Sequence, residues 1–131
     1  MASPTQRVLA RLKKHLWTAQ VVEKWNAFAK PFGRRIDLFG LIDVLAIRPG
    51  TILGVQASSG SDVASHIKKA MAEPRLVEWL DAGGKFQIWA WRKLKGSGKR
   101  AQWKIRVIDF KLIKTNEGKR QPFHVEIEAP E

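Results

Sequence analysis

The residues best suited to chemistry lie on two neighbouring strand-like runs that a tight turn can join. A turn at Pro49-Gly50 would set Asp43 directly opposite Gln56 on two antiparallel runs. Because side chains alternate along a strand, Ser58 and Gly54 would then share the face of Gln56. A carboxylate and an amide oxygen would lie side by side there, with space left by the glycine.

A second carboxylate can reach the same place from the preceding run. Folding of the chain about Gly40 would bring Asp37 across from Asp43. Oxygen ligands suit hard divalent cations such as Mg²⁺ or Mn²⁺, which complete their shell with water and substrate phosphate. A bound ion could polarise a phosphate and generate hydroxide, so the sequence predicts a phosphodiester-processing centre around Asp43.

The elements that would hold these residues follow from hydrophobic patterning and from the glycines and prolines. We expect three strands in an antiparallel meander, then two short helices and two or three further strands. The ranges are strands at 34–38, 41–48 and 51–58, helices at 62–71 and from Pro74 to Gly83-Gly84, and strands at 85–94, 101–113 and 123–127. The chain of 131 residues should form one domain, with a core at about 4–113 and a polar tail at 114–131.

The N-terminal segment predicts one long helix. Ser3-Pro4-Thr5-Gln6 is typical of a helix start, and the helix should run from there to about Ala29. Its apolar stripe consists of Leu9, Leu12, Leu16 and Ala19. The same stripe would contain Glu23, whose carboxylate needs a cation, a metal or a proton, unless it reaches solvent or pairs with Arg34 or Arg35.

Composition excludes several kinds of site. The chain has no cysteine, so it forms neither a disulfide nor a thiolate zinc site, and its three histidines lack ligand-like spacing. No apolar run is long enough to cross a membrane, and the N-terminus lacks the apolar stretch of a signal peptide. These features predict a cytoplasmic protein with no membrane partner.

The charge predicts a polyanionic partner. The 24 Lys and Arg residues against 12 Asp and Glu residues give a net charge of +12 at pH 7. Residues 1–35 carry a net charge of +7, residues 36–85 carry −1 and residues 86–131 carry +6. Basic segments can hold a phosphate backbone while a locally acidic middle holds a cation, so we expect a nucleic acid as the partner.

Several basic side chains are candidates for contact with DNA. Arg34 and Arg35 lead directly into the acidic strands. Four others surround a glycine-rich turn, namely Lys93, Lys95, Lys99 and Arg100. Most tryptophans are expected in the core, and Trp17 and Trp103 are the candidates for base stacking.

The two central runs resemble a known superfamily. Ile42-Asp43-Val44-Leu45-Ala46-Ile47, a turn and then Ile52-Leu53-Gly54-Val55-Gln56-Ala57-Ser58 are similar to the PD-(D/E)XK nucleases, notably the small Holliday-junction resolvase-like and phage nucleases. The resemblance implies an α/β fold with a restriction-endonuclease-like αβββαβ core, in which a mixed sheet is flanked by helices. It also implies that Asp43 is the metal-binding aspartate, that Gln56 takes the acidic position of the third strand, and that Glu23 is the first-helix carboxylate.

Two residues depart from the family pattern within the resemblance, which covers about residues 8–95. Gln56 keeps an oxygen ligand but removes a charge, and Ser58 replaces a lysine that would assist the attacking water or stabilise transition-state charge. Lys68 or Lys69, on the following helix, is the expected substitute. The expected catalytic residues are Asp43, Gln56, Ser58, Lys68 and Lys69, and the expected metal ligands are Asp43, Gln56, Glu23 and Asp37.

Three hypotheses stay open. A metal-dependent DNA nuclease acting on branched or structured DNA is favoured. The second hypothesis is a catalytically silent DNA-binding relative, because Gln56 and Ser58 depart from the catalytic pattern. The third is a basic RNA-binding protein, whose binding would not depend on the acidic residues around Asp43. Resolvase-like relatives often pair to cut two strands, so the resemblance also implies a homodimer.

Overall fold

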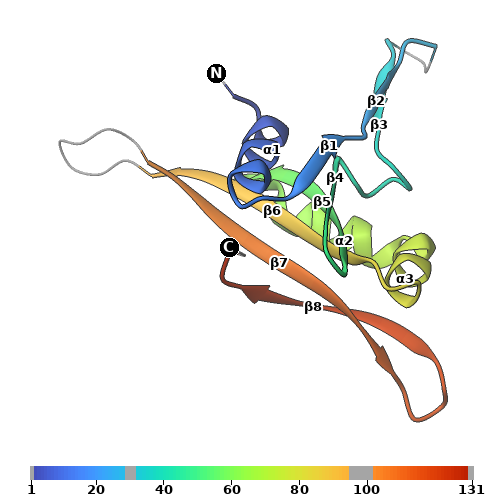
Figure 1. Cartoon of the computed structure of the whole chain (residues 1–131). Coiled ribbons are helices and arrows are strands. Elements are labelled where there is room, and N and C mark those ends of the chain that lie inside the picture. The colour runs from blue at the N-terminus through green and yellow to red at the C-terminus, as the bar shows by residue number, and fades with distance from the viewer. Residues whose placement is uncertain (1, 29–31, 95–101, 130–131) are drawn as a thin grey trace.

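The computed structural model describes residues 2–28, 32–94 and 102–129, and within them six strands form one mixed sheet (Figure 1). The strand order is β1-β4-β5-β6-β7-β8, with β5 parallel to β6 and every other pair antiparallel. The strands are β1 (Thr18–Val21), β4 (Val44–Arg48), β5 (Thr51–Ser59), β6 (Lys85–Leu94), β7 (Gln102–Lys114) and β8 (Arg120–Ile127). The expected α/β class with a mixed sheet is confirmed.

Helices cover both faces of this sheet. α1 (Pro4–Lys14) packs against one face, where its Leu12 shares a core with Val55 and Trp89. α2 (Val63–Ala72) and α3 (Pro74–Asp81) pack on the other face, against Ile88 and Phe110. Because alternate residues of β6 pack into the cores on the two faces of the sheet, its central residues form a continuous buried run. Among the helices of the described segments, none is long and apolar enough to span a bilayer.

The connection between β5 and β6 explains their parallel pairing. Parallel neighbours need a crossover, which here consists of the 3₁₀ turn η1 (Gly60–Asp62), α2 and α3. Pro74 opens α3, and the Glu73 carboxylate caps that helix by accepting a hydrogen bond from the Arg75 N–H at 3.0 Å. The two predicted helices and the strand predicted at 85–94 are therefore confirmed.

The N-terminal helix begins as predicted and ends much earlier. Ser3 Oγ accepts a backbone hydrogen bond at 3.2 Å, but the helix stops at Lys14 rather than near Ala29. Leu16 then adopts a left-handed conformation with φ of 68°, and Trp17 is buried in the core. The next residues pair with β4 as strand β1. Pairing with the sheet thus overrides the helical spacing of the apolar residues.

The strand predicted at 34–38 is shorter and lies outside the main sheet. β3 (Arg34–Ile36) pairs with β2 (Lys24–Asn26), and this two-stranded hairpin extends away from the main sheet in Figure 1. The antiparallel meander is instead β1-β4-β5. The strand predicted at 41–48 begins only at Val44, because Ile42 forms an isolated bridge with Leu38.

The remaining strand predictions are confirmed with small shifts. Arg48 pairs with Thr51 across the Pro49-Gly50 turn, which fixes the predicted register of β4 and β5. Much of the polar segment after residue 114 is strand β8, which pairs with β7 along its whole length. The predicted basic turn at 96–100 lies outside the described residues.

Gly54 should be required for the packing of β5. A Cβ at this position would lie 2.5 Å from Cδ1 and 2.7 Å from Cγ1 of the buried Ile42. Overpacking of this kind costs about 1–3 kcal/mol, so Gly54→Ala should lower the free energy of unfolding by that amount in urea titrations. Gly60→Ala is the control, because its Cβ would meet the exposed Arg92 at 3.3 Å. A Gly54→Ala protein as stable as the control would contradict this packing.

Candidate functional site

Three carboxylates from separate parts of the chain converge beside the main sheet. One side-chain oxygen each of Glu23, Asp37 and Asp43 lies within 4.8 Å of the other two. Glu23 follows β1, Asp37 follows β3 and Asp43 immediately precedes β4. We call these three residues the carboxylate cluster.

Asp43 is held on both sides by backbone hydrogen bonds. Its N–H donates to the Val55 carbonyl at 2.9 Å, although Val55 is already the register partner of Val44. Asp43 and Val44 therefore both lie opposite Val55, which is the arrangement of a β-bulge. A bulge changes the direction of the side chain, here that of Asp43. The Asp43 Oδ2 atom accepts a hydrogen bond from the Ala57 N–H at 2.8 Å, and the Asp43 carbonyl accepts one from Val22 at 2.8 Å. The carboxylate is thus fixed to β5.

Asp37 reaches the cluster through the turn at Gly40. Leu38 and Ile42 exchange two backbone hydrogen bonds of 3.0 Å, and Gly40 takes the positive φ that the turn requires. In this register the next pair outward consists of Asp37 and Asp43. The expectation that folding about Gly40 brings these two aspartates together is confirmed.

Glu23 joins the cluster by a route that differs from the predicted one. It lies between β1 and β2 and not on a helix, so the predicted position on a helical stripe is wrong. Its carboxylate accepts a hydrogen bond from Arg35 Nη1 at 3.3 Å, and its side chain is 15% exposed. Of the two arginines expected as partners, the structure therefore pairs Glu23 with Arg35.

Burial and the neighbouring carboxylates disfavour the ionised form of Asp43 in the cluster. Burial, the hydrogen bond with Asp37 and the charge of Asp37 raise the pKa of Asp43 to about 9, and the charge of Glu23 adds to this. The hydrogen bond from Ala57 acts in the opposite direction. A buried carboxylate among like charges is stabilised by a proton or by a cation, and oxygen ligands suit a hard divalent ion.

Gln56 and Ser58 are buried on β5 as expected, on the face opposite to α1. Their neighbours Val55 and Ala57 belong to the core under α1, so alternation turns Gln56 and Ser58 to the side of α2. Ser58 Oγ donates to the Ser59 carbonyl at 2.8 Å. Because the bulge sets Asp43 together with Val44 opposite Val55, the predicted position of Asp43 directly opposite Gln56 is wrong. Joint binding of one cation by Asp43 and Gln56 stays a prediction.

Helix α2 carries the predicted lysines and a histidine that the sequence reasoning missed. Lys68 and Lys69 are exposed. His66 is half-buried, and its Nδ1 atom is buried without a hydrogen-bond partner among the described residues. Burial lowers the pKa of His66, while the charges of Asp62 and Asp37 oppose that shift. Its position between Val63 and Ile67 on the apolar stripe was the signal for an inward-facing residue.

The expected DNA-binding side chains are spread over the surface. Arg34 and Arg35 are exposed on β3, and Lys93 lies 6.0 Å from the centre of the Trp103 ring. Lys95, Lys99 and Arg100 lie outside the described residues. Of the two stacking candidates, Trp17 is buried and covered by Arg48, and Trp103 is covered by Arg7 at 3.8 Å.

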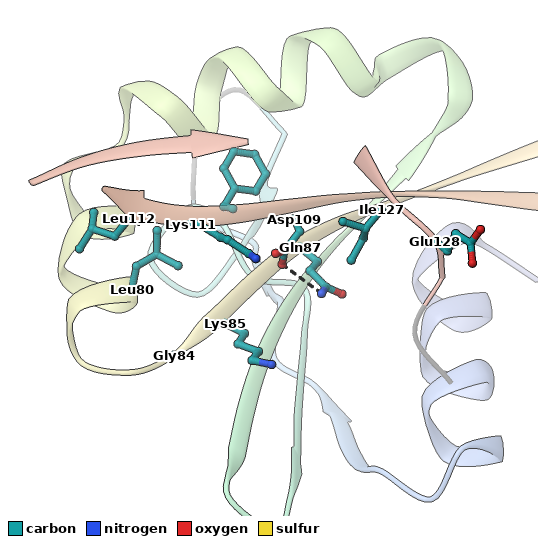
Figure 2. Close-up of a pocket in the computed structure, with 10 residues that line it drawn as sticks. Leu80, Gly84, Lys85, Gln87, Asp109, Lys111, Leu112, Ile127 and Glu128 are labelled. Atoms are coloured by element: carbon teal, nitrogen blue, oxygen red, sulfur yellow. Dashed lines mark hydrogen bonds between the residues drawn. The ribbon is translucent and has the colours of Figure 1, made fainter. Parts of the chain in front are cut away.

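A separate pocket of about 610 Å³ lies between α3, β6, β7 and the end of β8 (Figure 2). The described residues that line it include no member of the carboxylate cluster. In its wall, Gln87 Nε2 donates to Asp109 Oδ1 at 3.1 Å, and Trp89 Nε1 donates to Gln87 Oε1 at 2.9 Å. Each of these buried polar groups has a partner, so the network orients Trp89 in the core.

Comparison with protein-family models gives no match, and a search of curated proteins gives no significant match.

The pKa of Asp43 predicts a pH-dependent stability. The pKa of Asp43 is 3.8 in the unfolded chain and about 9 in the folded protein. At pH values between these two, the folded state binds more protons than the unfolded state. The free energy of unfolding in EDTA should therefore fall as pH rises from about 5 to about 8. Asp43→Asn should flatten this slope, and Mg²⁺ should raise the Tm of the wild type at about pH 8 more than that of the variant. Equal slopes in urea titrations of the two proteins would contradict the shift.

Proposed function

We propose that this protein is a Mg²⁺- or Mn²⁺-dependent DNA nuclease with a restriction-endonuclease-like core. The observation that carries the proposal is the carboxylate cluster, in which three acidic side chains from distant segments meet around the buried Asp43. The cluster belongs to a protein of net charge +12, which favours a polyanionic substrate.

The connectivity supports this family resemblance. The order α1, β1, β4, β5, α2 and β6 gives an antiparallel meander followed by a helical crossover to a parallel strand. This order supports the αβββαβ core that the resemblance implies, if the β2-β3 hairpin is an insertion between the first two strands and α3 an addition to the crossover. Asp43 then precedes the second strand of the core and Gln56 lies on the third.

The chain's own residues have distinct roles in this proposal. Asp43, Asp37 and Glu23 would hold the cation, with the Gln56 amide as a neutral oxygen ligand. A bound divalent ion would supply Lewis-acid activation of phosphate and water. Arg35 borders the cluster through its ion pair with Glu23, and Arg34 precedes it on β3. Both arginines would hold the phosphates that flank the scissile bond.

The exposed lysines of α2 would supply the positive charge that the family's lysine provides on the third strand. Lys68 or Lys69 would stabilise charge that develops on the phosphate. A homodimer would allow two such centres to act on two strands, as the resemblance implies.

A catalytically silent DNA-binding protein is the second candidate. Ser58 occupies the position of the family's lysine, and its hydroxyl is engaged with the Ser59 carbonyl. The site therefore has no cation at that position of β5, and activity depends on charge supplied from elsewhere.

Asp43→Asn should abolish metal-dependent cleavage. The substitution removes the buried ligand, and we expect a loss of more than about 100-fold in the rate at which supercoiled, linear and four-way-junction DNA are cut with Mg²⁺ or Mn²⁺. The exposed Glu117→Gln, on the turn between β7 and β8, is the control and should cut like the wild type. Clean binding without cutting in either metal would favour the silent relative. A preference for RNA that ignores Asp43 would favour an RNA-binding protein.

Binding to DNA should weaken steeply with salt. If about six phosphates are neutralised, the plot of log K against log salt concentration should have a slope of about −5. Fluorescence anisotropy in EDTA measures this slope without cleavage. A binding constant that does not change with salt would remove the electrostatic basis of the proposal.

A further inference from the structure

The β2-β3 hairpin carries large aromatic side chains that the rest of the protein leaves uncovered. Trp25 is 63% exposed, Phe28 is 94% exposed and Phe32 is 88% exposed. Figure 1 shows the hairpin standing away from the main sheet. Exposed aromatic groups gathered on one element, and not scattered singly, mark an interaction surface.

Trp25 is held in place on one side and open on the other. A Cβ on Gly33 would lie 2.6 Å from Cζ2 and 3.1 Å from Cε2 of the Trp25 ring. The indole therefore lies against the Gly33 backbone, which a side chain would prevent. Gly33 also has φ of 82°, a conformation that suits glycine. Trp25 is thus an ordered ring with much of its surface free for stacking.

A pocket of about 640 Å³ joins this ring to the carboxylate cluster. Its walls include Trp25, Phe28 and Lys24 from the hairpin, and Phe39 and Arg75 from the side of the Gly40 turn and α3. Asp37 also lines the pocket. Because Asp37 is a member of the carboxylate cluster, a ligand in the pocket would lie next to the proposed metal ligands.

The charges around the pocket select the chemistry of the ligand. The charged residues that line the pocket are Lys24, Arg75 and Asp37. Outside the lining, β3 adds the positive Arg34 and Arg35 to the hairpin. Aromatic rings among basic side chains bind single-stranded nucleic acid, because each base stacks on a ring while cations follow the phosphates. Paired bases already stack on each other, so the open ring of Trp25 favours an unpaired base.

We propose that the β2-β3 hairpin and its pocket bind an unpaired nucleotide of a DNA strand, with its base on Trp25 and the adjoining phosphate directed to the carboxylate cluster. The proposal rests on the nuclease function above and narrows its substrate to DNA with unpaired nucleotides beside the cut. Such substrates are flaps, forks and single-stranded gaps.

Binding to 2-aminopurine-labelled DNA tests this proposal. The probes are a blunt duplex and the same duplex with a single-stranded flap that carries 2-aminopurine at the branch, both in EDTA. The wild type should prefer the flap by roughly tenfold and change the 2-aminopurine fluorescence. Trp25→Ala should lose that preference and the fluorescence change, with the affinity for the blunt duplex unchanged, and Trp25→Phe should keep most of both.

Two further variants separate stacking from folding. Phe28→Ala removes a side chain that is 94% exposed, so it should leave the Tm unchanged and weaken flap binding severalfold. Phe123→Ala, on β8, is the matched aromatic control and should bind the flap like the wild type. Equal affinity of the wild type for flap and blunt duplex, or unchanged flap binding in both Trp25→Ala and Phe28→Ala, would overturn the proposal.

The outcomes distinguish this inference from the nuclease function. Metal-dependent cutting of blunt and flap DNA at the same rate in wild type and Trp25→Ala would overturn the inference and leave the nuclease function intact. Flap binding that depends on Trp25, without cutting in Mg²⁺ or Mn²⁺, would support nucleotide capture and overturn the nuclease function. Tighter binding to single-stranded RNA of the flap sequence would overturn the assignment to DNA.

Discussion

The burial of the Asp43 carboxylate next to two other acids is the constraint on which the site depends. Asp43 is 5% exposed and accepts a hydrogen bond from the Ala57 backbone, so it cannot turn to solvent without breaking its attachment to β5. Asp37 and Glu23 lie within 4.8 Å, and their proximity disfavours a charged Asp43. Packed cores on both faces of the sheet hold the segments that carry these charges. The arrangement favours a proton or a cation at this place.

The inserted hairpin links this constraint to the proposed substrate. It leaves the main sheet after β1 and returns before β4, so its two ends carry Glu23 and Asp37. The ion pair between Arg35 and Glu23 ties β3 to the start of the hairpin at the cluster. The element that completes the carboxylate cluster therefore also presents Trp25 and the basic side chains. A metal centre and a nucleotide-binding surface on one hairpin would have their relative position fixed by the same backbone.

Those parts of the site that depend on short-range geometry were predictable. The Pro49-Gly50 turn fixes the register of β4 and β5, since a two-residue turn leaves little freedom in the pairing that follows. Gly40 likewise supplies the left-handed conformation that folds Asp37 back towards Asp43. Pro74 and the apolar run at 85–94 mark a helix start and a buried strand by local stereochemistry and patterning.

The sequence by itself therefore determined the central hairpin, the crossover helices, the excess of positive charge and the pairing of Asp37 with Asp43. Only the tertiary structure decided where the first helix ends, because the pairing of β1 with β4 satisfies backbone groups that a longer helix would satisfy equally well. The same long-range pairing moved Glu23 off the helix and into the cluster, and it separated β3 from the main sheet. Hydrophobic spacing reports which residues can be buried locally, whereas the choice of strand partner depends on distant segments.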